Sequence, residues 1–282
     1  MNRICLITGA TSGLGKATAA ALAKLGYNLI LVARSEDKGL KLANGLTKKY
    51  GINTSYYYCD ISSISSIKNL SKEIKESYDR IDVLINNAGV RFDEYKKSAD
   101  GIELTFATNH LGHFLLTYLL LDLLKNSNSA RIINVSSSAH SIKEMQINEL
   151  INPKEYNRSL VYGRSKLANV LFSFELFRRL VNTNITVNTL DPGGVATNFA
   201  RNNGLIPWIK HIGFYFSKHS LRTPKQGAET IIYLASSPEV EKVSGKFFIE
   251  KKQKQASPLA YNAYLAKQLW ELSEKQCGIK FL

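Results

Sequence analysis

The chain has 282 residues, of which 44% are hydrophobic, and a formal net charge of +14. This length and apolar share fit one large α/β domain, because no linker, repeat or low-complexity run divides the chain. The lysines are spread along the sequence without a run that looks like a nucleic-acid arm. We therefore favour a solvated basic surface and expect no nucleic-acid partner, with an anionic membrane surface or a phosphate-bearing cofactor as the other interpretations of the charge.

The three cysteines, Cys5, Cys59 and Cys277, have neither the spacing of a zinc site nor that of a disulfide framework, and no other spacing supports a metal. Cys5 and Cys59 lie in apolar stretches, so we expect buried, unreactive thiols in a reducing compartment. The first predicted strand begins near Arg3, which leaves no room for a signal peptide, and the most apolar run, 114–124, is too short to span a bilayer. These features predict a soluble, cytoplasmic protein.

Strand and helix patterns alternate along the chain. Short apolar runs without a helical period predict buried parallel strands, and the segments between them have helical spacing, some closed by glycine. The predicted strands are Ile4–Thr8, Tyr27–Ala33, Thr54–Cys59, Ile81–Ile85, Ala130–Val135, Ile185–Leu190 and Lys246–Ile249. The predicted helices are Gly13–Leu25, Glu36–Tyr50, Ser63–Tyr78, Gly101–Lys125 with a break near Gly112, Leu160–Val181, Lys225–Leu234 and Pro258–Glu274.

Such alternation implies right-handed βαβ crossovers and a sheet covered on both faces. We therefore predict a three-layer α/β fold, a doubly wound parallel sheet of Rossmann type with about seven strands, as a single domain over residues 1–282. Ligands of such sheets bind beyond the carboxyl ends of the strands. The polar, glycine-rich clusters of this chain all follow predicted strands, so they are expected to form one site.

The first strand is followed by TGATSGLG, which opens a helix. Glycines let the backbone turn tightly and approach a pyrophosphate, while the helix N-terminus offers free N–H groups to the anion. A tight strand-to-helix turn without a ligand is the alternative, but the position at the first β–α junction favours a dinucleotide. The predicted contacts are Gly9, Thr11, Ser12, Gly13, Leu14 and Gly15.

The ends of the second and third strands bear on the choice of dinucleotide. Arg34 stands where NAD-binding chains usually have an acid for the ribose. Its guanidinium could bind a 2′-phosphate through charge-assisted hydrogen bonds, which favours NADP(H) over NAD(H); otherwise Arg34 is a solvated loop residue and Glu36 binds the ribose. Asp60, followed by Ile61, could accept from the adenine amino group or cap the next helix.

Two later turns suit the rest of a dinucleotide. The sequence NNAG after the fourth strand has small and amide residues that allow close backbone approach to a ribose, and the turn DPGGVAT after the sixth strand could seal the nicotinamide end. The predicted contacts are Asn87, Ala88, Gly89, Pro192, Gly193, Val195 and Thr197.

Tyr162 and Lys166 are four residues apart, so in a helix they share one face. A nearby ammonium favours the phenolate and brings the phenol, whose pKa is normally about 10, toward the range of a general acid–base at neutral pH. Of the serines 136–138 after the fifth strand, any could bond a carbonyl oxygen or merely cap the strand, and without a GxSxG motif none is expected as a nucleophile. Asn109, in an apolar helix, either bonds the backbone or holds a water, and the neighbouring histidines are expected as packing or surface residues.

In order, TGxxxGxG, NNAG, an asparagine, a serine, YxxxK and a PG turn resemble the short-chain dehydrogenase/reductase family over about residues 3–250. The sequences NHLGHFLLT, SKLAN and LWELS resemble its retinol dehydrogenase branch, which is often NADP-linked. The resemblance implies hydride transfer between a nicotinamide and an alcohol or carbonyl carbon. It implies that Tyr162 is the acid–base, that Lys166 holds the nicotinamide ribose, that Ser137 polarises the carbonyl and that Asn109 holds a relay water.

The family's segment matching residues 194–224 covers the substrate. Here Trp208, Ile209, Ile212 and Phe216 would share one helical face. We favour a lid over a small lipophilic, retinoid-like substrate, with a membrane or partner contact and core packing as alternatives. The branch often has an N-terminal membrane anchor, whereas this chain begins at the first strand. An NADP(H)-binding regulatory protein and a peripheral membrane protein are the alternative functions, and the chain is expected as a monomer or homo-oligomer.

Overall fold

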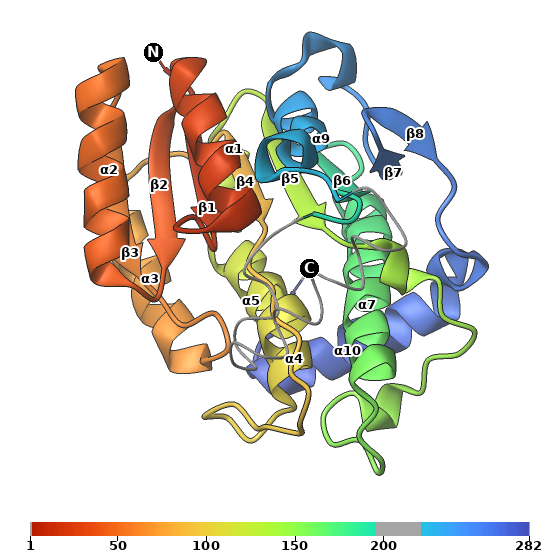
Figure 1. The fold of residues 1–282 in the computed structure, drawn as a ribbon. Coiled ribbons are helices and arrows are strands. Elements are labelled where there is room, and N and C mark those ends of the chain that lie inside the picture. Colours follow the sequence, from red (N-terminus) through yellow and green to blue (C-terminus); the bar gives the residue numbers. More distant parts are fainter. Residues whose placement is uncertain (1, 196–220, 282) are drawn as a thin grey trace.

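The computed structural model describes residues 2–195 and 221–281, which form a sheet between two layers of helices (Figure 1). Eight strands have the order β3-β2-β1-β4-β5-β6-β7-β8. The first seven are parallel, and β8 pairs antiparallel with β7. Their bounds are β1 Ile4–Thr8, β2 Asn28–Ala33, β3 Thr54–Tyr58, β4 Val83–Asn86, β5 Ala130–Val135, β6 Ile185–Asp191, β7 Lys246–Ile249 and β8 Lys252–Lys254.

The two faces of the sheet bury separate hydrophobic cores. In β1, Cys5 and Ile7 belong to one core and Leu6 to the other, because successive strand residues point to opposite faces. The first core is covered by α1 Gly13–Lys24, α2 Glu36–Tyr50 and α9 Pro224–Ser236. The second is covered by α3 Ile64–Ser77, α4 Leu104–Phe106, α5 Gly112–Leu119, α6 Leu121–Lys125, α7 Arg158–Arg179 and α10 Ala263–Cys277.

The predicted fold class, a single-domain doubly wound sheet in three layers, is confirmed, and the described residues form eight strands where about seven were expected. The additional strand, β8, follows a tight turn in which Glu250 and Lys251 have φ of 53° and 62°. All three residues of β8 are exposed, so no hydrophobic pattern marked this segment as a strand. Its two lysines lie at the edge of the sheet, where charge discourages pairing with another chain.

The expected helix break near Gly112 is wrong. The chain stays helical from Leu104 to Leu119 through a π-helical segment, Ala107–Leu111, and the interruption falls at Leu120. The Gly112 N–H donates to the carbonyl of Ala107, five residues back. A Cβ at Gly112 would overlap the carbonyl oxygen of Ile61, so the glycine allows the helix to approach the loop after β3.

The last predicted helix is divided in two. A 3₁₀ turn covers Pro258–Tyr261, and α10 begins only at Ala263, because the Asn262 side chain caps it by accepting from the Leu265 N–H. Trp270 of α10 packs against Phe114 and Phe172, with ring centroids 5.1 and 5.9 Å away. The C-terminal helix is thereby part of the core that α5 and α7 share.

All three cysteines are free and buried, as expected for Cys5 and Cys59. Burial raises the pKa of the Cys59 thiol to about 12, so it stays protonated at neutral pH. Within residues 2–195 and 221–281, no helix is both long and apolar enough to cross a bilayer.

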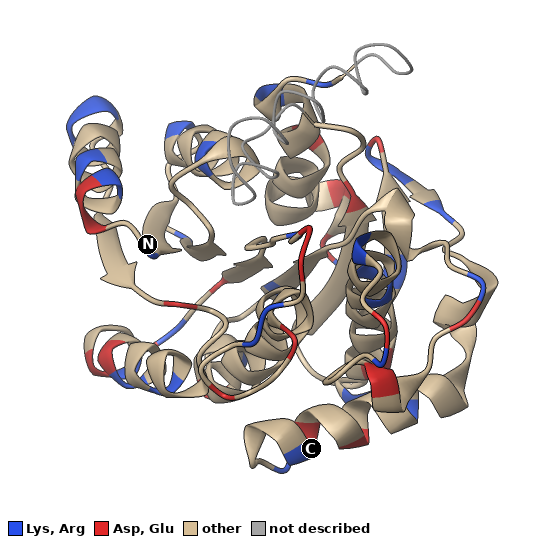
Figure 2. Ribbon diagram, turned by 60° about the horizontal axis from the view of Figure 1, so that its bottom comes forward, with Lys and Arg blue, Asp and Glu red and all other residues tan. Residues whose placement is uncertain are grey.

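Lysines and arginines are distributed over many elements rather than gathered on one (Figure 2). They occur on α2, α3, α7, α9, α10 and β8 alike. This distribution agrees with the interpretation of the positive charge as a solvated surface.

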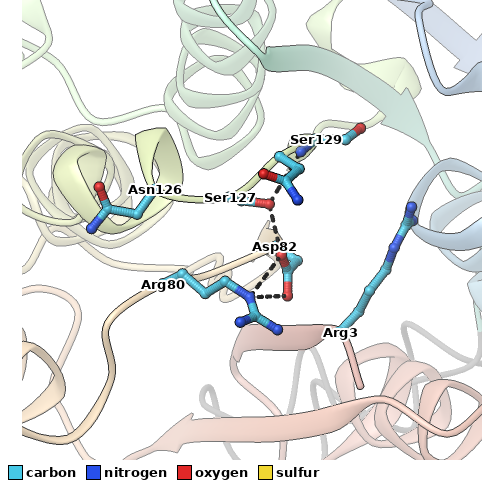
Figure 3. A pocket seen from close by; sticks show the side chains of 7 residues that line it. Arg3, Arg80, Asp82, Asn126, Ser127 and Ser129 are labelled. Atoms are coloured by element: carbon cyan, nitrogen blue, oxygen red, sulfur yellow. Dashed lines mark hydrogen bonds and ion pairs between the residues drawn. The ribbon is translucent and has the colours of Figure 1, made fainter. Parts of the chain in front are cut away.

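A small polar cavity of about 450 Å³ lies at the amino ends of β1, β4 and β5, at the opposite end of these strands from their carboxyl ends. Figure 3 shows the side chains that line it. At its centre the Asp82 carboxylate accepts hydrogen bonds from the Ile4 N–H at 2.7 Å and from the Ser127 hydroxyl at 2.6 Å. Arg80 lies 3.4 Å from the same carboxylate. These bonds connect the start of β1 to β4 and to the chain entering β5, so the cluster stabilises the fold at the amino ends of the strands.

Candidate functional site

A cavity of about 820 Å³ lies at the carboxyl ends of the parallel strands, where the sequence placed its ligand site. This volume is within the range of about 300 to 1,000 Å³ that ligand pockets occupy. All but one of the predicted cofactor contacts line it: Gly9, Thr11, Ser12, Gly13, Leu14, Gly15, Arg34, Asp60, Ile61, Asn87, Ala88, Gly89, Tyr162, Lys166, Pro192, Gly193 and Val195. The exception, Thr197, lies outside the described residues, as does the predicted lid face around Trp208.

The glycine-rich turn after β1 is built for close approach of a ligand to the backbone. Gly9 has φ of 67°, and a Cβ at Gly15 would overlap the Gly9 carbonyl oxygen. Ser12 stands at the N-cap of α1, yet its side chain makes no capping bond within the described chain. The N–H groups at the start of α1 are therefore left for an anion, as in dinucleotide sites.

The hydroxyl of Thr8 joins the end of β1 to the turn after β4. It accepts from the N–H groups of Asn87 and Ala88, both at 2.9 Å, while the Asn87 amide donates to the Thr8 carbonyl at 2.8 Å. His113 completes this junction from α5, with Nε2 3.0 Å from the Thr8 hydroxyl and Nδ1 3.1 Å from the Asn109 carbonyl oxygen. Burial lowers the pKa of His113 to about 3, so it is a neutral packing residue, which was one of its two expected roles.

Asn109 is fully buried in the π-helical segment and does not line the cavity. Its amide oxygen accepts from the Val90 N–H at 2.7 Å, and its amide nitrogen donates to the Val90 carbonyl at 3.0 Å and to the Ser165 hydroxyl at 2.9 Å. Ser165 in turn donates to the Tyr162 carbonyl at 2.8 Å. Of the two sequence alternatives, the structure contains the bond to the backbone, and Asn109 is connected through Ser165 to the first turns of α7.

Tyr162 and Lys166 lie on the same side of α7 and both line the cavity. The Lys166 ammonium is 5.7 Å from the centre of the Tyr162 ring and donates to the Val135 carbonyl at 3.1 Å. Burial lowers the pKa of Lys166 to about 8, and the nearby Asp191 carboxylate opposes this shift. At neutral pH the side chain is therefore mostly a cation, held beside the phenol in a poorly hydrated place.

The three serines after β5 have different environments. Ser136 is buried and donates to the Lys166 carbonyl at 2.8 Å, which commits its hydroxyl to the protein. Ser137 lines the cavity, and its oxygen accepts from the Ala139 N–H at 3.3 Å, so its own proton stays available to a ligand. Ser138 also lines the cavity but is exposed.

Arg34 lines the cavity two residues before the start of α2, and it is exposed. Lys38, on the first turn of α2, lines the same region and was not predicted, because Arg34 precedes the helix and no helical spacing relates the two residues. Arg91, just after the NNAG turn, also lines the cavity and was missed, because nothing in its neighbourhood distinguished it from a solvated arginine.

Asp60 does not cap the following helix, which was one of its two predicted roles. Its carboxylate accepts from the N–H and hydroxyl of Ser62, at 2.9 and 2.7 Å, and the N-cap of α3 is Ser63. Asp60 lines the cavity, as its other predicted role requires.

The comparisons with known proteins agree with this geometry. The family described as short chain dehydrogenase matches residues 3–205. Retinol dehydrogenase 14 of Homo sapiens is 42% identical over 97% of this chain and 86% of its own length, and polyprenol dehydrogenase of Homo sapiens is 36% identical over 99% and 86%.

Solved structures agree as well. A crystal structure of an uncharacterized protein from Mycobacterium paratuberculosis aligns with a TM-score of 0.79 and 31% identity, covering 99% of this chain and 95% of that one. The Pseudomonas aeruginosa RhlG/NADP active-site complex aligns with a TM-score of 0.70 and 26% identity, covering 87% and 93%. With its motifs gathered on one cavity and these relatives spanning almost its whole length, the chain belongs to the short-chain dehydrogenase/reductase family and to its retinol dehydrogenase branch.

Proposed function

We propose that the protein is an NADP(H)-dependent oxidoreductase that transfers a hydride between C4 of the nicotinamide and the carbinol or carbonyl carbon of a small lipophilic substrate. The observation that carries the proposal is the meeting of Tyr162, Lys166 and Ser137 on one cavity with the glycine-rich turn of β1. A site of this kind has a phenol, a cation, a hydroxyl donor and a place for a pyrophosphate within reach of one another. A metal has no part in the proposed reaction.

The described residues fit a dinucleotide. The uncapped start of α1 suits the pyrophosphate, and Lys166 lies deep enough in the cavity to bind a nicotinamide ribose. When bound, the cofactor supplies the hydride chemistry, and the protein supplies orientation and electrostatics.

In the reductive direction, we assign the proton steps to three side chains. The Ser137 hydroxyl donates to the substrate carbonyl oxygen, because its own oxygen already accepts from Ala139. Tyr162 donates its phenolic proton to the oxygen as the alcohol forms, and Lys166 stabilises the phenolate left behind. The amide of Asn109 is already bonded to Val90 and Ser165. The relay water that the family resemblance assigns to Asn109 stays a prediction.

A lipophilic substrate is supported by the names of the relatives, since retinol and polyprenol are both long, apolar alcohols. The proposed lid at 194–224 would provide the apolar cover; among its described residues, Val195 and Arg222 form a β-bridge that brings its two ends together. Membrane contact by this segment, cytoplasmic residence and the oligomeric state stay predictions.

A panel of carbonyls and alcohols tests the proposed function. We expect NADPH-dependent reduction of long apolar aldehydes or ketones with kcat/KM at least about tenfold above that of sugars and other polar carbonyls, because an apolar pocket gains binding energy from each buried methylene. Turnover is followed by the absorbance of the reduced cofactor. Equal rates for polar and apolar substrates would remove the basis for a lipophilic substrate, and binding of NADPH without any turnover would favour a regulatory protein.

Arg34 should determine the preference for NADP(H) over NAD(H). Because a guanidinium–phosphate pair contributes about 1.5 to 3 kcal/mol, R34A should raise the Kd for NADPH by about 10- to 100-fold and leave NADH binding almost unchanged. The matched control is K41A, which removes an exposed cation of α2 that does not line the cavity. An unaltered ratio of the two affinities in R34A would show that Arg34 is a solvated loop residue.

A further inference from the structure

The backbone of Ser137 is held by the side chain of a histidine three residues later. The Ser137 carbonyl oxygen accepts two hydrogen bonds from His140, one from its N–H at 3.0 Å and one from its Nδ1 at 2.7 Å. His140 is 4% exposed, and its ring lies 4.8 Å from that of Phe247 on β7. Because the carbonyl belongs to the peptide unit between Ser137 and Ser138, these two bonds fix the plane of that unit.

The second nitrogen of the same ring contacts a distant part of the chain. The Ser257 N–H donates to Nε2 of His140 at 3.0 Å, and the Ser257 hydroxyl donates to the His140 carbonyl at 3.3 Å. Ser257 follows β8 and stands directly before the 3₁₀ turn Pro258–Tyr261. The imidazole therefore connects the turn of Ser137 to the chain that leads into α10.

Both ring partners are backbone groups with fixed roles, so the tautomer follows. A carbonyl can only accept, which requires the proton on Nδ1, and an N–H can only donate, which requires a bare lone pair on Nε2. A proton on both nitrogens would set the Nε2 proton against the Ser257 N–H. Burial also lowers the pKa of His140, in agreement with a neutral ring.

We propose that His140 is a positioning residue for the Ser137 hydroxyl, and that the Ser257 N–H keeps its imidazole in the neutral Nδ1–H form that this role requires. The inference deepens the proposed function and rests on it. It assigns no contact between His140 and the substrate, since His140 does not line the cavity.

The turn that follows Ser137 is also packed against α7. A Cβ at Gly163, next to Tyr162 on α7, would lie 2.9 Å from the Ala139 carbonyl oxygen, so the 3₁₀ turn Ser138–His140 is seated directly on the helix of the phenol. The helix supports the turn from one side, and His140 holds it from the other. The distance between the hydroxyls of Ser137 and Tyr162 is then set by rigid elements, as a reacting pair requires.

Two variants of His140 separate its two bonds. Asparagine has an amide nitrogen at the same number of bonds from Cβ as Nδ1, so H140N can keep the bond to Ser137 and lose the bond to Ser257. Glutamine reaches as far as Nε2, so H140Q can keep the bond to Ser257 and lose the one to Ser137. We expect kcat of H140N within about threefold of the wild type and kcat of H140Q lower by about 10- to 100-fold, with similar KM and NADPH affinity, because small misplacements of reacting groups cost rate rather than binding.

Two variants of Ser257 give an independent test of the same bond. Its φ of −61° is compatible with proline, so S257P removes the N–H donor without a backbone conflict at that residue, whereas S257A keeps the N–H and removes only the hydroxyl. We expect S257P to lower kcat more than S257A does, because without the N–H donor the imidazole is free to carry its proton on Nε2 and to lose its bond to Ser137, an option that the asparagine of H140N does not have. Equal loss of kcat in H140N and H140Q, or equal effects of S257P and S257A at unchanged thermal midpoint, would overturn the positioning role.

Nitrogen NMR of the wild-type protein labelled in its histidines tests the tautomer of His140 without a measurement of turnover. A neutral His140 with its proton on Nδ1, assigned by its loss in H140N, is the expected result, and a protonated Nε2 at neutral pH would overturn the proposal. Failure of the wild type on every carbonyl would instead remove the proposed function while leaving the NMR result readable. The two failures are therefore distinguishable.

Discussion

Replacing Tyr162 by phenylalanine should lower kcat by about a thousandfold while the Kd for NADPH changes by less than about threefold, because general acid–base groups contribute about 10²- to 10⁴-fold to a rate. The substitution keeps the ring and removes only the hydroxyl that we assign to proton transfer. The Lys166 ammonium would keep its bond to Val135, so the cofactor side of the cavity should be preserved. The measurement is steady-state reduction of the best carbonyl of the panel, with NADPH binding followed by its fluorescence.

Tyr156→Phe is the matched control. Its hydroxyl donates to the Phe92 carbonyl at 2.8 Å, and the residue does not line the cavity. Y156F should therefore reduce stability by about 1 kcal/mol, the usual value for a lost hydrogen bond, without a large effect on kcat. Turnover retained in Y162F would exclude the proposed mechanism, because no other described phenol lines the cavity.

Much of the fold could be predicted because strand burial follows local sequence. Runs such as Ile4–Thr8 have apolar residues on both faces of the sheet and appear as buried strands with almost the predicted bounds. Features that depend on tertiary contacts could not be predicted. The strand Lys252–Lys254 has only polar residues and forms through its pairing with β7. The helix continues through Gly112 despite the low helix propensity of glycine, at a place where a side chain would overlap Ile61.

The same distinction between local and distant contacts applies to the site. Its glycines and its Tyr162–Lys166 pair could be recognised because their spacing alone brings them together on a turn or a helix face. The partners that hold them in place come from distant segments: His140 and Ser257 are 117 positions apart, and Thr8 and His113 are 105 apart. No local pattern predicts such pairs, so the sequence left His113 as a packing or surface residue and gave no role to His140.

The buried histidines should make the protein sensitive to mild acid. Burial lowers the pKa of both His110 and His113 from the ordinary value of 6.5 to about 3. Between these two values the unfolded chain binds protons that the folded chain excludes, so the free energy of unfolding must fall as the pH falls. The contribution of each histidine approaches about 1.4 kcal/mol per pH unit below pH 6.5, which amounts to about 3 kcal/mol for the pair between pH 6.5 and 5.

That loss is a large share of the roughly 5 to 15 kcal/mol that stabilises a typical domain, and the window lies above the range in which most carboxylates titrate. Urea unfolding at a series of pH values should show the slope directly, and H110Q isolates one contributor. His110 lies outside the cavity with Nε2 2.9 Å from the Ser273 hydroxyl, and glutamine has a similar reach and no proton to gain. We expect H110Q to flatten the slope by about 1.4 kcal/mol per pH unit. An unchanged slope would mean that His110 takes up its proton in the folded protein at nearly the same pH as in the unfolded chain, which its burial among Phe106, Phe114 and Phe172 opposes.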